Sequence, residues 1–143
     1  MKQTMKECIL QQPDTIRAVM AGASQQREAI GMILASGEFR QIFLIGSGTS
    51  LNAALAAKYA LLRYVKAEIQ VFTPFEFLNY GPHRRIGPHT LVLGISQTAR
   101  SIGTIRCMEL SRKCGAQTIF VTAEPENPGA VSAHAVLNTC TGQ

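Results

Sequence analysis

The chain has 143 residues, of which 46% are hydrophobic and 16% are charged, and its formal net charge at pH 7 is +5. This length and composition favour one globular domain with an apolar core and exclude a disordered chain. The basic residues are scattered apart from a small cluster at His83, Arg84 and Arg85. We therefore expect an anionic ligand but no nucleic-acid partner, because nucleic-acid binding normally needs a denser basic stripe with interleaved aromatic residues.

The first predicted element is a helical segment over residues 13–35, in the form of two helices or one kinked helix. Its apolar residues recur at three- and four-residue steps, and Gly22 is the candidate break. Gly37 ends the pattern. We therefore expect residues 1–36 to form an N-terminal helical leader and residues 37–143 to form the main domain.

Short apolar runs after residue 37 predict buried strands that alternate with amphipathic helices. These runs lack the alternation of a half-exposed strand, which indicates burial on both faces. The expected elements, in chain order, are a strand at 41–45, a helix to about 65 with Thr49 or Ser50 as N-cap, a strand at 67–72, a loop at 73–88 with one helical turn, a strand at 90–95, a helix at about 98–113, a strand at 116–122, a loop at 124–129 and a strand at 135–137.

This alternation predicts an α/β fold of the doubly wound, flavodoxin-like or Rossmann-like type. A five-stranded parallel sheet would lie between helices in a three-layer αβα sandwich, preceded by the N-terminal helices. In the common strand order 2-1-3-4-5, the first and third strands are neighbours, and the helices after them leave on opposite faces. The binding site is therefore expected at the carboxyl ends of these two strands.

Two hydroxyl-rich loops come after these two strands, in the sequences IFLIGSGTS (42–50) and SQTARS (96–101). Because each loop precedes a predicted helix, backbone N–H groups and the positive end of a helix macrodipole should face the crevice. Either loop alone could be no more than a helix cap, since Ser and Thr cap helices anywhere. Two converging loops favour an oxygen-rich anion, with hydroxyls from Ser47, Thr49, Ser50, Ser96, Thr98 and Ser101.

Nucleotide-binding motifs are incomplete in this sequence. The dinucleotide fingerprint GxGxxG would need glycine where the chain has Leu51, and the second strand does not end in an acidic residue. No lysine follows Gly46 or Gly48 at the spacing of a P-loop. We therefore expect no nucleotide cofactor.

The cysteine spacing and the length of the apolar runs indicate the cellular compartment of the chain. Cys8, Cys107, Cys114 and Cys140 show no Cys-x-x-Cys spacing, which favours free thiols in a reducing compartment over a metal site or disulfides. No run reaches the roughly 18 apolar residues of a membrane span, and the first residues lack the apolar core of a signal peptide. We expect a cytoplasmic chain with no membrane partner and no metal.

Several motifs resemble the sugar isomerase (SIS) domain family. They are MKECILQQPDTI, GSGTS, Phe75-Glu76-Phe77, SQTARSIGT and the ENP loop before the last strand, so the resemblance covers nearly the whole chain. It is greatest to the first of the two SIS domains in the isomerase module of glucosamine-6-phosphate synthase and in fructosamine-phosphate deglycases and isomerases. The family commonly has Gly and then Glu or Asn where this chain has Ala99 and Arg100, which leaves the exact sugar open.

The resemblance implies a site for a sugar phosphate such as fructose 6-phosphate or a fructosamine 6-phosphate. Arg100 would either add a charge to the anion site or point to solvent, and Glu76 is a further accessory candidate. The residues implied to hold the phosphate and nearby hydroxyls are Ser47, Gly48, Thr49, Ser50, Ser96, Gln97, Thr98 and Ser101.

Aldose-ketose isomerisation needs a general base beside a carbonyl, normally Glu or His. An isolated Glu or His side chain in a protein is more often solvated or locally hydrogen bonded than catalytic. No two of the candidates in this chain form a convincing acid-base pair, so the catalytic residues stay unassigned. The candidates are Glu76, Glu124, His83, His89 and His134.

The resemblance implies that the base comes from a second domain, from the segment after that domain or from a partner subunit. It also implies an SIS domain that is truncated at its C-terminus, without the helix that should cover the last strand. We therefore expect exposed apolar surface, a homo-oligomer and no activity of the chain alone.

Three functions fit the sequence. The chain is the phosphosugar-binding half of an isomerase or deglycase, a stand-alone module that senses a sugar phosphate, or a single-domain isomerase that completes its site across a homodimer. The first is favoured over the second because no helix-turn-helix is evident in residues 1–36.

Overall fold

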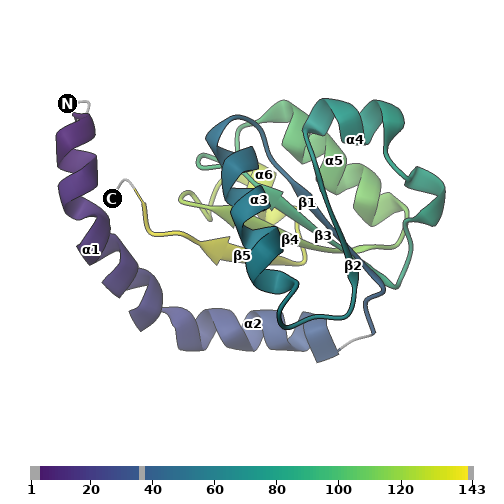
Figure 1. The fold of residues 1–143 in the computed structure, drawn as a ribbon, viewed down its shortest axis with the longest axis horizontal. Coiled ribbons are helices and arrows are strands. Elements are labelled where there is room, and N and C mark those ends of the chain that lie inside the picture. Colours follow the sequence, from purple (N-terminus) through teal and green to yellow (C-terminus); the bar gives the residue numbers. More distant parts are fainter. Residues whose placement is uncertain (1–3, 36–37, 142–143) are drawn as a thin grey trace.

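The computed structural model describes residues 4–35 and 38–141, and it confirms the predicted α/β architecture. A five-stranded, all-parallel sheet has the order β2-β1-β3-β4-β5, with helices on both faces (Figure 1). The strands are β1 (Gln41–Ile45), β2 (Glu68–Phe72), β3 (Thr90–Ile95), β4 (Gln117–Thr122) and β5 (Ala135–Asn138).

The helices form the two outer layers and an N-terminal extension. Helices α2 and α3 lie on one face of the sheet, and α4, α5 and α6 lie on the other (Figure 1). Their bounds are α1 (Met5–Ala21), α2 (Ala23–Ala35), α3 (Thr49–Leu61), α4 (Pro74–Tyr80), α5 (Ile102–Lys113) and α6 (Pro128–Val131), with a 3-10 turn at His83–Arg85.

Two apolar layers hold the sheet between the helices. Successive side chains of a strand point to opposite faces, so Phe43 packs with Phe77 of α4 and Leu44 belongs to the layer that contains Ala54 of α3. Each fully buried large apolar side chain stabilises the fold by roughly 1.5–3 kcal/mol. Burial on both faces explains why the apolar run of β1 does not alternate.

The N-terminal segment forms two helices that meet at the predicted break, Gly22. Helix α1 begins at Met5, not at Pro13, because Thr4 and Glu7 form a capping box: the Glu7 carboxylate accepts from the Thr4 backbone N–H at 2.6 Å, and the Thr4 hydroxyl accepts from the Glu7 N–H at 3.3 Å. No residue of α1 is buried. The predicted stop at Gly37 and the boundary between residues 36 and 37 lie outside the described residues, so the division into leader and main domain stays a prediction.

Three helix predictions were wrong in extent, and local backbone chemistry explains each. Residues 74–80 form a helix rather than a loop with one turn, because Thr73 and Glu76 form a second capping box. Helix α5 begins at Ile102 rather than Thr98, because Ala99 has a φ of +50° that no right-handed helix contains. Helix α6 overlaps the predicted loop at 124–129, and its N-cap Asn127 accepts a hydrogen bond from the Gly129 N–H at 3.1 Å.

The expectation that the last strand lacks a covering helix was also wrong. Helix α2 packs against β5, where the Gln26 side-chain amide donates to the Asn138 carbonyl at 3.3 Å, and α6 contacts the same strand. The N-terminal extension therefore closes part of the layer that we expected to be open. Within the described ranges, no helix has both the length and the apolar character to cross a membrane.

Candidate functional site

The loops after β1 and β3 begin at neighbouring positions on the carboxyl edge of the sheet. Ile45 of β1 pairs with Gly94 of β3 in parallel register. The Gly46 N–H then donates to Phe72 at the end of β2, and the Ser96 N–H donates to Val121 of β4. The two hydroxyl-rich loops therefore begin at adjacent strand ends, as predicted from the strand order, and the convergence of their hydroxyls on one ligand stays a prediction.

The glycines of GSGTS serve the backbone of the loop. A Cβ on Gly46 would lie 2.8 Å from the backbone carbon and oxygen of Ser50, so the first turn of α3 can approach β1 only because residue 46 has no side chain. Gly48 has a φ of +56°, which favours glycine. These two requirements set the direction in which α3 leaves the sheet.

Gly48, rather than Thr49 or Ser50, is the N-cap of α3, so the predicted cap was wrong. No side chain caps this helix. The structure shows no hydrogen bond from the hydroxyl of Thr49 or Ser50 to any described residue. These two hydroxyls are therefore not used as helix caps, and their role in ligand binding stays a prediction.

A cavity of about 340 Å³ lies at the carboxyl edge, and we call it the edge cavity. It brings together three predicted residues, Thr49, Ser50 and Gln97. Three residues that sequence reasoning missed also line it: Thr122 is the last residue of β4, and Thr139 and Thr141 come after β5. Each lies at or after the carboxyl end of a strand, and that position is the signal that could have identified them.

The other predicted phosphate-binding residues do not line the edge cavity. Ser47 and Ser101 line a separate hollow of about 400 Å³ beside α4. The Ser96 side chain is buried, whereas Thr98 is exposed. The eight predicted residues of the two loops therefore do not share one cavity. Their common role in phosphate binding stays a prediction.

The two accessory candidates have partners within the chain. Arg100 forms an ion pair with Glu124 at 3.1 Å, and its side chain is 72% exposed. The Glu76 carboxylate accepts from the backbone N–H of Thr73 at 2.9 Å and from its hydroxyl at 2.8 Å. The hydrogen bond from the Thr73 backbone N–H has the larger effect and that from the Thr73 hydroxyl the smaller, and both lower the pKa of Glu76. Its carboxylate is therefore a weaker base than that of an ordinary glutamate.

The three histidines are each locally bonded. A ring nitrogen of His83 donates to the Phe77 carbonyl, and Nδ1 of His89 donates to the Glu38 carbonyl at 3.1 Å. Nδ1 of His134 accepts from the Thr118 N–H at 3.1 Å. Burial lowers the pKa of His134, and the Arg112 charge lowers it further. No group of three His, Cys, Asp or Glu side chains among the described residues could hold a metal ion.

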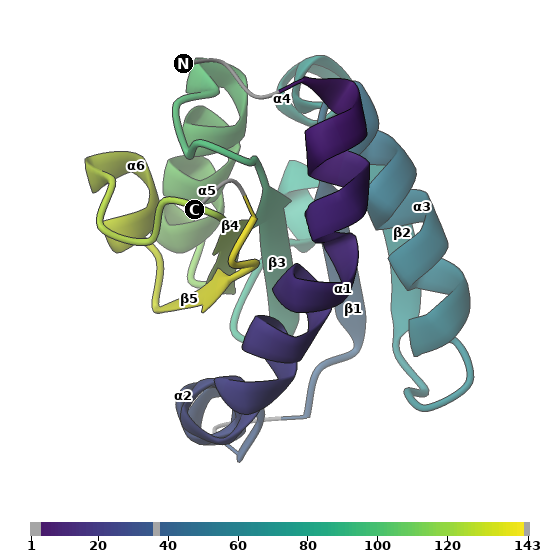
Figure 2. The same cartoon turned by 90° about the vertical axis from the view of Figure 1, so that its left-hand side faces the viewer.

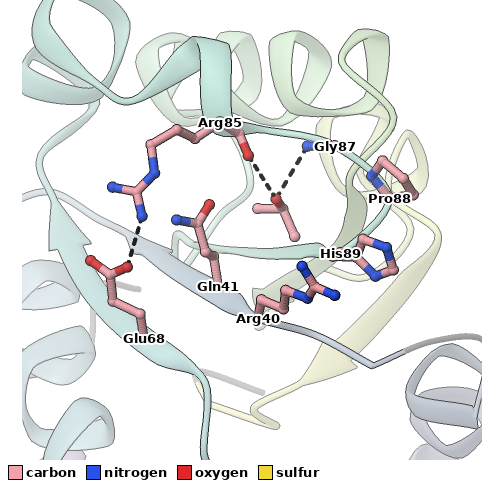
Figure 3. Close-up of a pocket in the computed structure, with 8 residues that line it drawn as sticks. Arg40, Gln41, Glu68, Arg85, Gly87, Pro88 and His89 are labelled. Carbon is pink, nitrogen blue, oxygen red and sulfur yellow. Dashed lines mark hydrogen bonds and ion pairs between the residues drawn. The ribbon is translucent and has the colours of Figure 1, made fainter.

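A further pocket of about 460 Å³ lies at the opposite, amino edge of the sheet (Figure 3). Arg40 and His89 stand at its rim, and Arg85 forms an ion pair with Glu68 at 2.9 Å. The Gln41 side chain lies between these charges. This exposed ion pair links β2 to the 3-10 turn, and the pocket contains the candidate base His89 but none of the predicted phosphate-binding residues.

Comparison with known proteins points to one family. A family model for the SIS domain matches residues 38–143. Fructoselysine 6-phosphate deglycase from Escherichia coli (strain K12) is 30% identical over 88 residues, which make up 62% of this chain and 26% of the deglycase. The chain thus spans about a quarter of the length of that relative.

Two solved structures share the fold. The C-terminal domain of glucosamine-fructose-6-phosphate aminotransferase from Francisella tularensis aligns with a TM-score of 0.79 and 20% identity, over all of this chain and 41% of that one. The Vibrio vulnificus NanR protein complexed with ManNAc-6P aligns with a TM-score of 0.72 and 16% identity, over 92% of this chain and 50% of that one. Both are similar to this chain in architecture.

Proposed function

Because the chain belongs to the SIS domain family, we propose that it is the phosphosugar-binding part of a sugar-phosphate isomerase or deglycase. The observation that carries the proposal is the edge cavity, where the hydroxyls of Thr49 and Ser50 have no partner among the described residues and stand with the Gln97 side chain. The ligand is fructose 6-phosphate or a fructosamine 6-phosphate. The related deglycase is named for fructoselysine 6-phosphate, a compound of the second kind.

The edge cavity binds the phosphate through neutral groups. Helix α3 begins at Thr49 and runs for 13 residues, so the positive end of its macrodipole faces a bound anion. The hydroxyls of Thr49 and Ser50 add hydrogen-bond donors. Arg100 keeps its ion pair with Glu124, and no charged side chain lines the cavity within the described residues.

The proposed role is binding without catalysis by the chain alone. Isomerisation or deglycation needs a group that moves a proton beside a carbonyl, and no Glu, Asp or His of the described part lines the edge cavity. The catalytic base would come from a second domain or from a partner subunit. The chain spans only a quarter of the related deglycase, a relation that fits this division of labour.

A stand-alone sugar-phosphate sensor is the alternative function. The NanR protein has a similar fold and is complexed with ManNAc-6P, and a sensor needs no general base. A sensor would bind the sugar phosphate and leave it unchanged even when every natural partner is present, whereas an isomerase or deglycase would convert it. A turnover assay in the presence of the natural partner separates the two.

We also propose that the chain is a homo-oligomer. Four large apolar side chains of α1, at Met5, Ile9, Ile16 and Met20, are between 55% and 80% exposed. Their spacing places them on one side of the helix, and we call them the α1 stripe. Contiguous apolar surface of this kind is typical of interaction sites.

The proposed location is the cytoplasm, where thiols stay reduced. Cys8, Cys107, Cys114 and Cys140 form no disulfide bond with one another in the structure. Free cysteines are typical of proteins in a reducing compartment.

Thermal melting with fructose 6-phosphate tests the proposed function. We expect the ligand to raise the melting temperature, because it binds the folded state alone. Replacing Thr49 by valine and Ser50 by alanine, the two predicted hydroxyl residues that line the edge cavity, should abolish the shift, whereas Ser24→Ala, an exposed serine of α2, should leave it unchanged. An equal shift in the double variant would contradict the proposed pocket.

A further inference from the structure

Helix α1 stands beyond the carboxyl ends of the strands, opposite the edge cavity. Figure 1 shows α1 on the side toward which the strands run, and in Figure 2, viewed from that side, α1 passes in front of β1 and β3. A second cavity of about 410 Å³ lies between this helix and the sheet edge, and we call it the α1 cavity. Helix α1 lines it with Gln11, Gln12 and Thr15 on its polar side and with Cys8 and Ile16 beside them.

The α1 cavity and the edge cavity adjoin. Gln97 and Thr141 line both of them. A molecule whose phosphate lies against Thr49 and Ser50 can therefore extend past Gln97 toward α1.

The lining of the α1 cavity carries no charge, and its polar groups are amides and hydroxyls set among the apolar surface of Cys8 and Ile16. Gln11 and Thr15 are half-buried and stand four residues apart, so both face the body of the protein. The charged Asp14 and Arg17 of the same helix form an ion pair with each other at 2.6 Å and do not line the cavity. The described structure gives the Gln11 amide no hydrogen-bond partner.

Uncharged donors and acceptors suit hydroxyl groups better than charges. A carboxylate or ammonium group that leaves water without a partner of opposite sign loses much of its hydration energy. A sugar hydroxyl needs only an amide or another hydroxyl as partner. An uncharged lining therefore favours fructose 6-phosphate over fructosamine 6-phosphates that carry charged groups.

We propose that Gln11 and Thr15 of α1 bind the end of the ligand remote from its phosphate and select sugar phosphates that present neutral hydroxyls there. The site thus disfavours fructosamine phosphates that carry a charged amino-acid group. This inference rests on the proposed function, which places the phosphate in the edge cavity.

Calorimetric titration of the 143-residue chain tests the inference. Fructose 6-phosphate should bind more tightly than fructoselysine 6-phosphate. Replacing Gln11 by Leu together with Thr15 by Val should weaken fructose 6-phosphate binding about tenfold, as expected for the loss of one or two hydrogen bonds, and leave the affinity for inorganic phosphate unchanged. The matched control is Gln25→Leu, the same substitution at an exposed glutamine of α2 outside both cavities.

A charge substitution gives the inference a second, independent readout. Gln11→Glu should raise the affinity for fructoselysine 6-phosphate relative to fructose 6-phosphate, because the new carboxylate can pair with an amine of the ligand. Since no residue of α1 is buried, these variants should melt at the temperature of the unaltered chain.

The outcomes separate the inference from the proposed function. An unchanged affinity for fructose 6-phosphate in the Gln11→Leu, Thr15→Val variant, unchanged relative affinities in Gln11→Glu, or tighter binding of fructoselysine 6-phosphate by the unaltered chain would overturn the inference and leave the proposed function standing. If the unaltered chain binds inorganic phosphate and neither sugar phosphate, the inference and the proposed function both fail.

Discussion

The Thr122 hydroxyl donates a hydrogen bond of 2.9 Å to the backbone carbonyl of Gln97. The Ala123 N–H donates to the same carbonyl at 2.9 Å, and the Glu124 N–H donates to the Thr122 hydroxyl at 3.1 Å. The end of β4 thereby fixes the loop that comes after β3. This connection positions Gln97, which with Thr141 lines both cavities.

Thr122→Val should destabilise the fold by about 1–3 kcal/mol, because valine keeps the shape of the fully buried threonine but neither donates to Gln97 nor accepts from Glu124. Fructose 6-phosphate should also bind more weakly, since Gln97 loses its support. Urea denaturation and calorimetry measure the two effects. Thr98→Val alters an exposed threonine of the same loop and should change the free energy of unfolding by less than about 0.5 kcal/mol. Equal stability of the two variants would contradict this role of Thr122.

Gly46→Ala should destabilise the protein and disrupt ligand binding, because the new methyl group would overlap the backbone of Ser50. The matched substitution Gly31→Ala is in α2, where a Cβ meets nothing within 4 Å. It should stabilise the protein by about 0.5–1 kcal/mol through helix propensity. Chemical denaturation of both variants checks the prediction, and a stabilised Gly46→Ala protein would refute it.

Acid should destabilise the chain partly through His134. Its folded-state pKa lies below the ordinary value of 6.5, so the unfolded chain binds more protons between these two pKa values, and stability falls as pH decreases through this window. His134→Gln removes the titration and keeps an oxygen that can accept from Thr118. The melting temperature of the unaltered chain should therefore fall more steeply below pH 6.5 than that of the variant. Parallel curves would exclude this contribution, since His83 and His89 are present in both proteins.

Cys107 should resist thiol reagents in the folded protein. Burial raises the pKa of its thiol to about 12, so almost no thiolate exists near pH 8. Mass spectrometry after treatment with an alkylating reagent should find Cys107 unmodified until denaturant is added, and the exposed Cys8 modified first. Rapid alkylation of Cys107 in the native chain would show that its layer of the core opens readily.

The α1 stripe should cause self-association at high concentration. Replacing Ile9 and Ile16 together by glutamate should give a smaller average mass in light scattering, because charge on an apolar contact surface opposes association. Val131→Glu is the control, since Val131 is 61% exposed on α6, away from the stripe. A monomeric unaltered chain would contradict the proposed oligomer.

The sheet was predictable because strands buried on both faces have continuous apolar runs in the sequence. The predicted β1 and β3 match the structure in both bounds, and the strand order is the common one that we expected for a doubly wound sheet. The two capping boxes were present as Thr4 with Glu7 and Thr73 with Glu76, so the starts of α1 and α4 could have been found from the sequence.

The rest of the site depends on contacts between distant segments. Thr139 and Thr141 reach the edge cavity because β5 pairs with β4, and α1 faces it because α2 packs on β5. No local pattern encodes either relation. The turn at Ala99 was hidden for a different reason, since alanine gives no sign of a positive φ.

Helix α1 has no buried residues and is joined to α2 at Gly22, so the helix that we propose as a wall of the ligand site contributes little to the stability of the fold. Substitutions on this helix remove no core packing, so natural variation can exchange Gln11 or Thr15 at little thermodynamic cost. The core beneath would keep its phosphate-facing loop unchanged. One scaffold could thus acquire new sugar preferences by mutation of a single peripheral helix.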